Sequence, residues 1–333
     1  MYKERILTGD RPTGALHLGH YVGSLQSRVE LQNKYETFIL IADVQALTDN
    51  FNNPDKIRKN IIELLKDYLA VGIDPKVSKI VLQSGIPQIA ELTVFYSNLV
   101  TVNRLLRNPT VKSEIREKFA DKNIPFGFLG YPVSQAADIT SFMADLVPVG
   151  DDQLPMLEQT VEIVKSFNSI YGEVLKVPKP KLSKLPRLVG LDGKSKMSKS
   201  LGNTIRFADT LEDVKKKIMS MYTDPSRIHK NDPGHVVGNP VFIYHDAFNT
   251  NKDEVDELKE LYTNGKIGDV EVKEKLFIAL KEFLLPIQER RHSFDGREDY
   301  LYDILQEGTL FARDVAAKTL NAVKDAMKLI QYN

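Results

Sequence analysis

Two histidines near the amino terminus are placed where they could act on a phosphate group. His17 and His20 flank Gly19 within the stretch LTGDRPTGALHLGHYVG, which runs from Leu7 to Gly23. This pattern predicts a short strand, a turn with glycines and a proline, and then the start of an amphipathic helix. Backbone N–H groups at a helix start attract phosphate oxygens, and neutral imidazoles could donate further hydrogen bonds to them. Because Gly19 has no Cβ, a flat purine ring could lie directly on the backbone there.

A lysine-rich loop far along the chain is a second candidate for phosphate chemistry. Lys196 and Lys199 lie within the polar, glycine-flanked stretch LDGKSKMSKSLGN. Two lysines at this spacing could hold a polyphosphate, and the glycines would allow the loop to close on it. A solvated charged loop is the alternative, and the presence of the histidine motif argues against it.

A polar pair interrupts an apolar segment between Tyr131 and Gln153. Pro132 is expected to start a helix there, on which Gln135 and Asp138 lie three residues apart and share a face. A carboxylate on such a helix needs a hydrogen-bond donor, because an unpaired buried charge is costly. Neighbouring backbone could supply that donor, so the residues alone leave the role of Asp138 open.

The elements that must position these groups alternate between strand and helix. Apolar runs of strand length occur at Arg5–Thr8, Thr37–Asp43 and Lys79–Gln83. Asn53 and Pro54 predict the start of a helix between the last two runs. This alternation predicts a doubly wound, Rossmann-like α/β domain with a parallel sheet, whose ligand binds at the carboxyl ends of the strands. No GxxxxGK[ST] loop is present and the first turn does not match GxGxxG, so the common P-loop and dinucleotide patterns are excluded.

Later segments are interpreted from their apolar pattern. A helix from Gln88 to about Arg107 is expected to form a dimer interface, because its apolar face is too broad to be left in water. Leu146–Val149 predicts a strand, whereas the proline- and lysine-rich segment from Lys176 to Arg187 predicts an extended linker. From Thr204 onward the pattern is helical, with an interruption at Pro286. The last helix is expected to pack against the body through a stripe of apolar residues, namely Ala316, Leu320, Val323, Met327 and Ile330.

The composition of the 333-residue chain limits its classes of function. With 42% hydrophobic residues it can bury a sizeable core, and two domains are expected. The 45 basic and 45 acidic residues balance, which argues neither for nor against a nucleic-acid partner. The absence of cysteine excludes disulfides, thiolate nucleophiles, cysteine-ligated zinc and iron–sulfur clusters. No signal peptide or membrane-spanning run is recognised, so a cytoplasmic protein with no membrane partner is expected.

The two phosphate motifs together resemble the HIGH and KMSKS signatures of class I aminoacyl-tRNA synthetases. Over essentially its whole length the chain is similar to the bacterial tryptophanyl-tRNA synthetases, most closely in the AADI segment with Asp138 and the VPVGDDQ segment that ends at Gln153. The resemblance implies a Rossmann-like doubly wound sheet of the HUP type with an all-helical carboxyl-terminal domain. It also implies a homodimeric ligase that forms tryptophanyl-adenylate and pyrophosphate from L-tryptophan and ATP with Mg²⁺, and then charges the 3′ end of tRNA(Trp).

The resemblance also assigns site residues. Those that would act catalytically on the phosphates are His17, His20, Lys196 and Lys199, and no protein side chain is assigned as a metal ligand. The residues that would hold ATP are Arg11, Pro12, Thr13, Gly19, His20, Gly150, Asp151, Asp152, Leu188, Lys196, Met197, Ser198, Lys199 and Ser200. The residues that would hold tryptophan are Leu7, Gln45, Tyr131, Gln135, Asp138, Val147, Val149 and Gln153. Among these, Tyr131 and Gln153 would bind the ammonium group, and Asp138 would accept the indole N–H, which is a donor only.

The same resemblance divides the chain into regions. Residues 1–203 would form the catalytic domain, with a dimer-forming insertion at about 84–145. Residues 204–292 would form the helical anticodon-binding domain, and 293–333 the helices that pack back on the body. Basic residues are the candidate RNA contacts of the helical part, namely Arg227, His229, Lys230, Arg290 and Arg291.

Some pocket residues depart from the family pattern. Gln45, Gln135 and Leu7 stand where many bacterial tryptophanyl enzymes have His, Met and Phe. Gln135 with Tyr131 and Asp138 resembles the pocket of tyrosyl-tRNA synthetases, which are therefore the alternative family. A catalytically idle paralogue that binds RNA or senses tryptophan is a further alternative, against which both phosphate motifs are intact.

Overall fold

The computed structural model describes residues 3–119, 123–150, 153–182, 188–194, 197, 201–229 and 231–331. In this part of the chain, five parallel strands form one sheet in the order β3-β2-β1-β4-β5. The strands are β1 (Arg5–Asp10), β2 (Glu36–Ile41), β3 (Ser78–Leu82), β4 (Leu146–Val149) and β5 (Lys179–Leu182). The chain winds outward from β1 to β3 and then crosses β1 to add β4 and β5, which is the doubly wound arrangement that the sequence predicts.

Helices precede, link and follow the strands. Those of the first half are α1 (Leu18–His20), which continues through a π-helix (Tyr21–Leu25) into α2 (Gln26–Leu31), then α3 (Asp43–Ala46), α4 (Pro54–Val71), a 3₁₀ turn (Gln83–Gly85), α5 (Pro87–Ser97), α6 (Val102–Arg107), α7 (Pro109–Lys118), α8 (Phe126–Ser141) and α9 (Leu154–Tyr171). Those of the second half are α10 (Leu211–Met219), α11 (Pro240–Phe248), α12 (Lys252–Thr263), α13 (Asp269–His292) and α14 (Glu298–Ala326). None of the described helices combines the length and hydropathy that a bilayer crossing requires.

The core lies on both faces of the sheet. Successive residues of β2 point to opposite faces, so Ile39 and Ile41 enter one apolar cluster and Phe38 and Leu40 enter the other. The first cluster is completed by α4 and the helices of the second half, and the second by α5, α8 and α14. Covering both faces explains why β2 is an unbroken apolar run, as expected for a parallel sheet.

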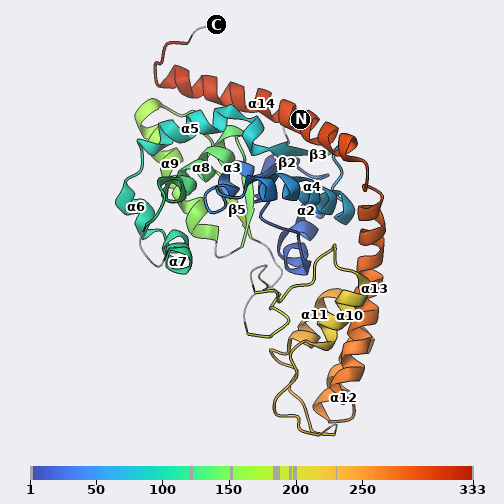
Figure 1. The fold of residues 1–333 in the computed structure, drawn as a ribbon. Coiled ribbons are helices and arrows are strands. Elements are labelled where there is room, and N and C mark those ends of the chain that lie inside the picture. Colours follow the sequence, from blue (N-terminus) through green and yellow to red (C-terminus); the bar gives the residue numbers. More distant parts are fainter. Residues whose placement is uncertain are drawn as a thin grey trace.

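The chain ends in a long helix that returns to the sheet. Figure 1 shows α10 to α13 gathered at one end of the molecule, and α14 crossing the other end beside β3 and α5. The stripe predicted for this helix is confirmed at Ala316, Leu320 and Val323, which are buried, but not at Ile330, which is 83% exposed. Thr309 of α14 also accepts the Leu82 N–H through its hydroxyl at 3.0 Å, which satisfies a backbone group of the edge strand β3.

Three predictions made from prolines are wrong, each for a local reason. The expected linker contains β5, in which Pro180 pairs in register with Val147, because an edge strand tolerates proline. Pro132 lies inside α8, which begins at Phe126. The earlier start could not be recognised from the sequence, because the first turns of this helix contain two glycines and show no clear helical pattern of apolar residues. α13 continues through Pro286, since Pro286 and Glu282 are not buried and the carbonyl without an N–H partner faces water.

The helix predicted from Gln88 to Arg107 is two helices. The residues between α5 and α6 end with Thr101, whose hydroxyl accepts the Arg104 N–H and caps α6. Much of the apolar face assigned to a dimer is buried within this chain, since Leu92 and Tyr96 lie in the core with α8 and α14. Burial by the chain itself therefore accounts for most of that face.

Candidate active site

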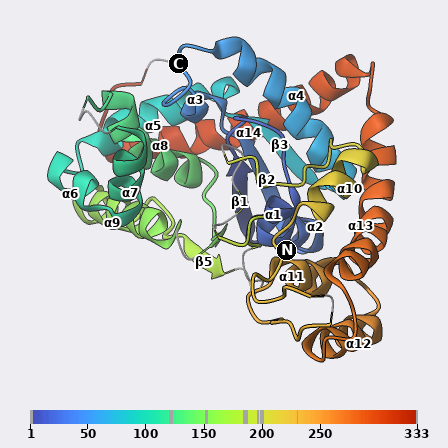
Figure 2. The ribbon, with the colours of Figure 1, turned by 60° about the horizontal axis from the view of Figure 1, so that its bottom comes forward.

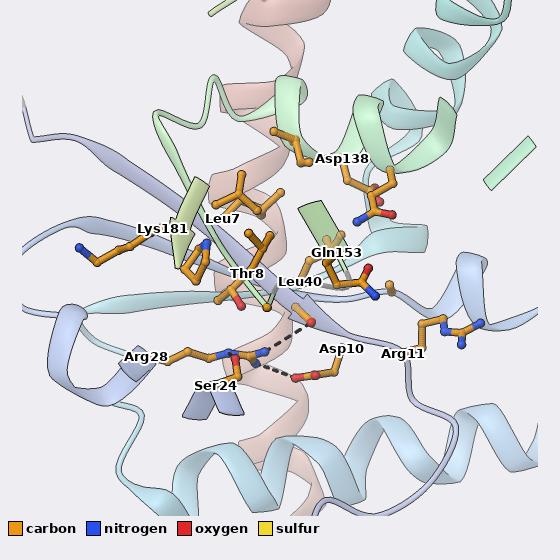
Figure 3. A pocket seen from close by; sticks show the side chains of 18 of the residues that line it. Leu7, Thr8, Asp10, Arg11, Ser24, Arg28, Leu40, Asp138, Gln153 and Lys181 are labelled. Atoms are coloured by element: carbon orange, nitrogen blue, oxygen red, sulfur yellow. Dashed lines mark hydrogen bonds and ion pairs between the residues drawn. The ribbon is translucent and has the colours of Figure 1, made fainter. Parts of the chain in front are cut away.

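A cavity of about 310 Å³ opens at the carboxyl ends of β1, β2 and β4. It lies between β1 and β4, where the winding of the sheet reverses and where ligands of doubly wound folds bind. Figure 3 shows its two sides: Asp138 and Gln153 lie on one, and Ser24, Arg28 and Lys181 on the other. The predicted site residues that line it are Leu7, Arg11, Gln45, Gln135, Asp138, Val147, Val149, Gly150 and Gln153.

Asp138 is a buried carboxylate with a donor from a distant strand end. It is 3% exposed, and its Oδ1 accepts a hydrogen bond from Nε2 of Gln83 at 2.8 Å. The other amide atom of Gln83, Oε1, accepts the backbone N–H of Gln45 at 3.0 Å, which fixes the orientation of the amide. Burial raises the pKa of Asp138 to about 8, with the Gln83 hydrogen bond opposing this shift and the charge of Asp43 adding to it.

The other side of the cavity contains a strong ion pair. Oδ2 of Asp10 lies 2.6 Å from Nη1 of Arg28 and accepts the Tyr68 hydroxyl at 2.6 Å. Burial opposes ionisation of Asp10, yet the charge of Arg28 and the hydrogen bonds from Arg28 and Tyr68 hold the pKa of that carboxyl well below its usual range. Arg28 also donates through Nε to the Ser24 hydroxyl at 2.9 Å. Because Arg28 lies in α2 and Asp10 ends β1, their ion pair joins the strand to the helix.

The histidine motif begins α1 and caps it with its own side chains. Nδ1 of His17 accepts the Gly19 N–H at 3.1 Å, and Nδ1 of His20 accepts the His17 N–H at 3.2 Å. In a neutral ring with Nδ1 as acceptor, the proton is on Nε2. The two rings lie with centroids 3.8 Å apart. The motif therefore holds two imidazoles side by side, each in the tautomer that donates from its outer nitrogen.

Gly19 of the histidine motif lies against Met197, the described residue of the lysine motif. A Cβ built on Gly19 would lie 2.9 Å from the His17 ring and 3.0 Å from the sulfur of Met197, so no larger residue fits without movement. Met197 is buried, and its N–H points to the Leu188 carbonyl at 3.5 Å. Met197 is thereby placed against the start of α1, although the two are far apart in the sequence. Six of the residues predicted to hold ATP lie outside the described residues, namely Asp151, Asp152, Lys196, Ser198, Lys199 and Ser200.

Some predicted residues lie apart from the cavity lining. Tyr131 is buried in a small cluster with Val111, Phe128 and Met156, and its hydroxyl lies 3.9 Å from the Met156 sulfur. Pro12 is buried, and Thr13 donates its N–H to the Arg11 carbonyl at 2.8 Å in the turn after β1. The role of Tyr131 in binding an ammonium group stays a prediction.

Three of the residues predicted to contact RNA make hydrogen bonds or ion pairs within the chain, and their role in RNA binding stays a prediction. Arg227 has a side chain only 2% exposed, stacks over the Tyr262 ring and pairs with Asp269 at 3.2 Å. Arg290 donates to the Ala70 carbonyl at 2.7 Å, and Arg291 is paired with acidic residues of α4. His229 is exposed, and Lys230 lies outside the described residues.

Sequence reasoning missed Gln83, Asp10 and Arg28. Gln83 and Asp10 do stand at the carboxyl ends of strands, which is the position where ligand-facing residues are expected. Arg28 has no such signal, because its partner Asp10 becomes a neighbour only when α2 packs beside β1.

Comparison with known proteins agrees with this geometry. A family model described as tRNA synthetases class I (W and Y) matches residues 2–285. The tryptophan–tRNA ligase of Clostridium longisporum is 56% identical over 338 residues, covering 100% of this chain and 99% of that protein. The corresponding ligase of Lactococcus lactis is 54% identical over 335 residues, covering 98% of each.

A solved structure shares the whole architecture. The tryptophanyl-tRNA synthetase of Campylobacter jejuni, complexed with ADP and tryptophan, has a TM-score of 0.87 and 29% sequence identity, covering 98% of this chain and 100% of that one. The tryptophanyl-tRNA synthetase of Mycoplasma pneumoniae has a TM-score of 0.83 and 27% identity, covering 99% of each. With a cavity at the switch point of the sheet, Met197 against Gly19 of the histidine motif and a family match over most of its length, the chain belongs to the class I tRNA synthetases of the tryptophan and tyrosine group.

Proposed function

We propose that this chain activates L-tryptophan with ATP and transfers the tryptophan to the 3′ end of tRNA(Trp). The observation that carries the proposal is the buried carboxylate of Asp138, which faces an otherwise largely apolar part of the cavity formed by Leu7, Leu40 and Val147. An indole ring offers an apolar body and a single N–H donor, and a carboxylate is an acceptor. The names of the curated relatives and the tryptophan in the Campylobacter structure support the same substrate.

The proposed reaction has two steps. In the first, a carboxylate oxygen of tryptophan attacks the α-phosphorus of ATP, and the bond to the pyrophosphate oxygen breaks. His17 and His20, held with Nε2 as their donor atom, would stabilise the charge that develops on the phosphate oxygens, as would Lys196 and Lys199. In the second, a hydroxyl of the terminal ribose of the tRNA attacks the tryptophanyl carbonyl and AMP leaves.

Mg²⁺ would enter with the nucleotide. Among the described residues no group of three or more His, Asp or Glu side chains could hold a metal ion. Mg²⁺ is commonly bound through substrate phosphates and water, and this mode of binding does not require a cluster of protein ligands. The ion would then neutralise charge on the pyrophosphate.

Partners and location complete the proposal. The tRNA would contact the part of the chain built from α10 to α13, and the protein would work in the cytoplasm. A second copy of the chain would cover the apolar residues that α5 and α6 leave exposed, which are Val94, Val102 and Leu106.

Tyrosine is the second candidate substrate, because Gln135 lines the same cavity as Asp138 and could bond a phenol hydroxyl. The test is exchange of labelled pyrophosphate into ATP, with each amino acid supplied alone. A site built around one buried hydrogen bond is expected to prefer its own substrate by about 10⁴-fold. Exchange with tyrosine alone would replace the proposed substrate, and exchange with neither would favour an idle paralogue.

A further inference from the structure

The last turn of α13 is connected to the histidine motif by two separate sets of hydrogen bonds. α13 begins beside Arg227 and Tyr262 in the helical region, and its 24 residues span roughly 36 Å at 1.5 Å per residue. Figure 2 shows it running from that region to α4 beside the sheet. Gln288 and Arg291 lie three residues apart near its end, on one face of the helix. Both are buried, although each side chain is strongly polar.

The first connection passes through Asp67 of α4. Nε of Arg291 lies 2.8 Å from Oδ1 of Asp67, and Oδ2 of the same carboxylate accepts the Leu16 N–H at 3.0 Å. Asp67 is fully buried, and Arg291 also pairs with Glu63. One carboxylate therefore joins the end of α13 to the residue directly before His17.

The second connection passes through the segment that follows the lysine loop. Nε2 of Gln288 donates to the Phe207 carbonyl at 3.3 Å and to the Asp209 carbonyl at 2.8 Å. Phe207 in turn donates its N–H to the Leu16 carbonyl at 3.3 Å. The Leu18 N–H donates to the Ile205 carbonyl at 3.0 Å, so 205–207 runs as a short antiparallel neighbour of Leu16–Leu18.

We infer that Asp67, Arg291 and Gln288 are positioning residues that set the backbone of the histidine motif for the nucleotide and join it to the helical region. The inference rests on the proposed function, because it concerns the adenylate-forming step. Backbone groups on both sides of His17 are held by partners that depend on the same helix end. A shift of that helix end moves the imidazoles relative to the phosphates, and small displacements of this kind lower the rate of reaction.

The experiment measures tryptophan-dependent exchange of pyrophosphate into ATP by the full chain and its variants. D67L/R291M removes both charges of the pair together, so that neither is left alone in the interior. The same double variant also leaves the Leu16 N–H without its acceptor. D67N/R291M also removes the ion pair, but the amide oxygen that it introduces at position 67 can still accept that N–H. D295N is the matched control, because Asp295 pairs with Lys66 at the same junction at 2.8 Å without contacting the motif.

We expect D67L/R291M to lose between about tenfold and 100-fold in kcat, while its KM for tryptophan changes by less than about twofold. D67N/R291M is expected to recover part of the lost rate, because the Leu16 N–H keeps an acceptor, and the loss that remains measures the missing contact between position 67 and Arg291. D295N is expected to behave as the wild type. Full recovery in D67N/R291M would overturn the role of Arg291. Wild-type kcat in D67L/R291M would overturn the inference. Equal losses in both double variants, or the same loss in D295N, would assign the effect to stability of the junction and would also overturn it.

Two further measurements distinguish a loss of folding from a loss of positioning. If D67L/R291M does not fold, Q288L tests the second connection without disturbing a buried charge, and a wild-type kcat in Q288L then overturns the inference. Thermal unfolding by circular dichroism establishes that each variant is folded at the assay temperature. Failure of the wild type to exchange with any amino acid would contradict the proposed function, whereas exchange by the wild type with unchanged variants contradicts this inference alone.

Discussion

Gln83 and Asp138, from a strand end and a helix that are 55 residues apart, share a 2.8 Å hydrogen bond beside the cavity. The amide of Gln83 is oriented by the Gln45 N–H, so its nitrogen faces the carboxylate. Among the described residues, Asp138 is therefore hydrogen-bonded to a neutral donor instead of a cation, and burial raises its pKa. This arrangement is more typical of a carboxylate that binds a donor of a ligand than of a carboxylate whose role is to stabilise the fold.

Asp138→Asn is expected to lower tryptophan-dependent exchange by about 100-fold, because it replaces a charge-assisted hydrogen bond with a neutral one. The variant should unfold no more easily than the wild type. The folded-state pKa of Asp138 is raised, so its ionisation costs stability as pH rises from the unfolded value toward about 8, and that cost is fully present above pH 8. Urea unfolding at about pH 5 and about pH 9 should show Asp138→Asn gaining stability mainly at the higher pH. Wild-type exchange in this variant would make Asp138 a structural residue.

The kcat/KM for tryptophan is expected to rise with pH with a midpoint at about pH 8, where half of the Asp138 carboxyls are ionised. The ionised carboxylate only accepts hydrogen bonds, whereas the protonated form has no charge and is the weaker acceptor for the indole N–H. Gln83→Leu should move the midpoint of this rise to higher pH, because the Gln83 donor stabilises the charged form. The same pH series on Asp138→Asn corrects for titration of the substrate. A midpoint that Gln83→Leu leaves in place would contradict the role of Gln83.

Gly19→Ala is expected to lower exchange by at least about tenfold and to destabilise the fold by about 1–3 kcal/mol, because the new methyl group would overlap the His17 ring and the Met197 sulfur. Gly130→Ala is the matched control, since Gly130 lies in α8 with open space at its Cβ position. That control should gain up to about 1 kcal/mol. Exchange rates together with denaturant unfolding of both variants check the prediction, and a neutral Gly19→Ala would argue against contact between the two motifs.

Arg227→Met is expected to destabilise the fold by about 2–3 kcal/mol, because it removes the ion pair with Asp269 and two hydrogen bonds to backbone carbonyls. The effect should be smaller than for a fully buried pair, since Asp269 is partly exposed. His229→Ala, at an exposed position of the same segment, should change the free energy of unfolding by less than about 0.5 kcal/mol. An Arg227→Met variant with wild-type stability and a raised KM for tRNA would instead restore Arg227 as an RNA contact.

Local pattern was enough to predict four of the five strands, the start of α4 and the strand ends at which the cavity lies. The features that carried these predictions are short-range, and each acts within a few residues of chain. They are the alternating apolar runs, Asn53 before Pro54, and the spacing of Gln135 and Asp138. The histidine motif could be identified for the same reason, because a helix start, glycine and two imidazoles act together over four residues.

Partners of buried charges could be decided only by the tertiary structure. Arg291 is a basic residue on a helix, a pattern that predicts a surface contact, yet the fold brings it to Asp67 across 224 residues. Likewise α8 and α14 cover part of the apolar face of α5, namely Ile89, Leu92 and Tyr96, which the sequence assigns to a dimer interface. The segment with Pro180 predicts a linker but pairs with β4. Burial and charge pairing depend on which distant elements pack together, and no short window of sequence contains that information.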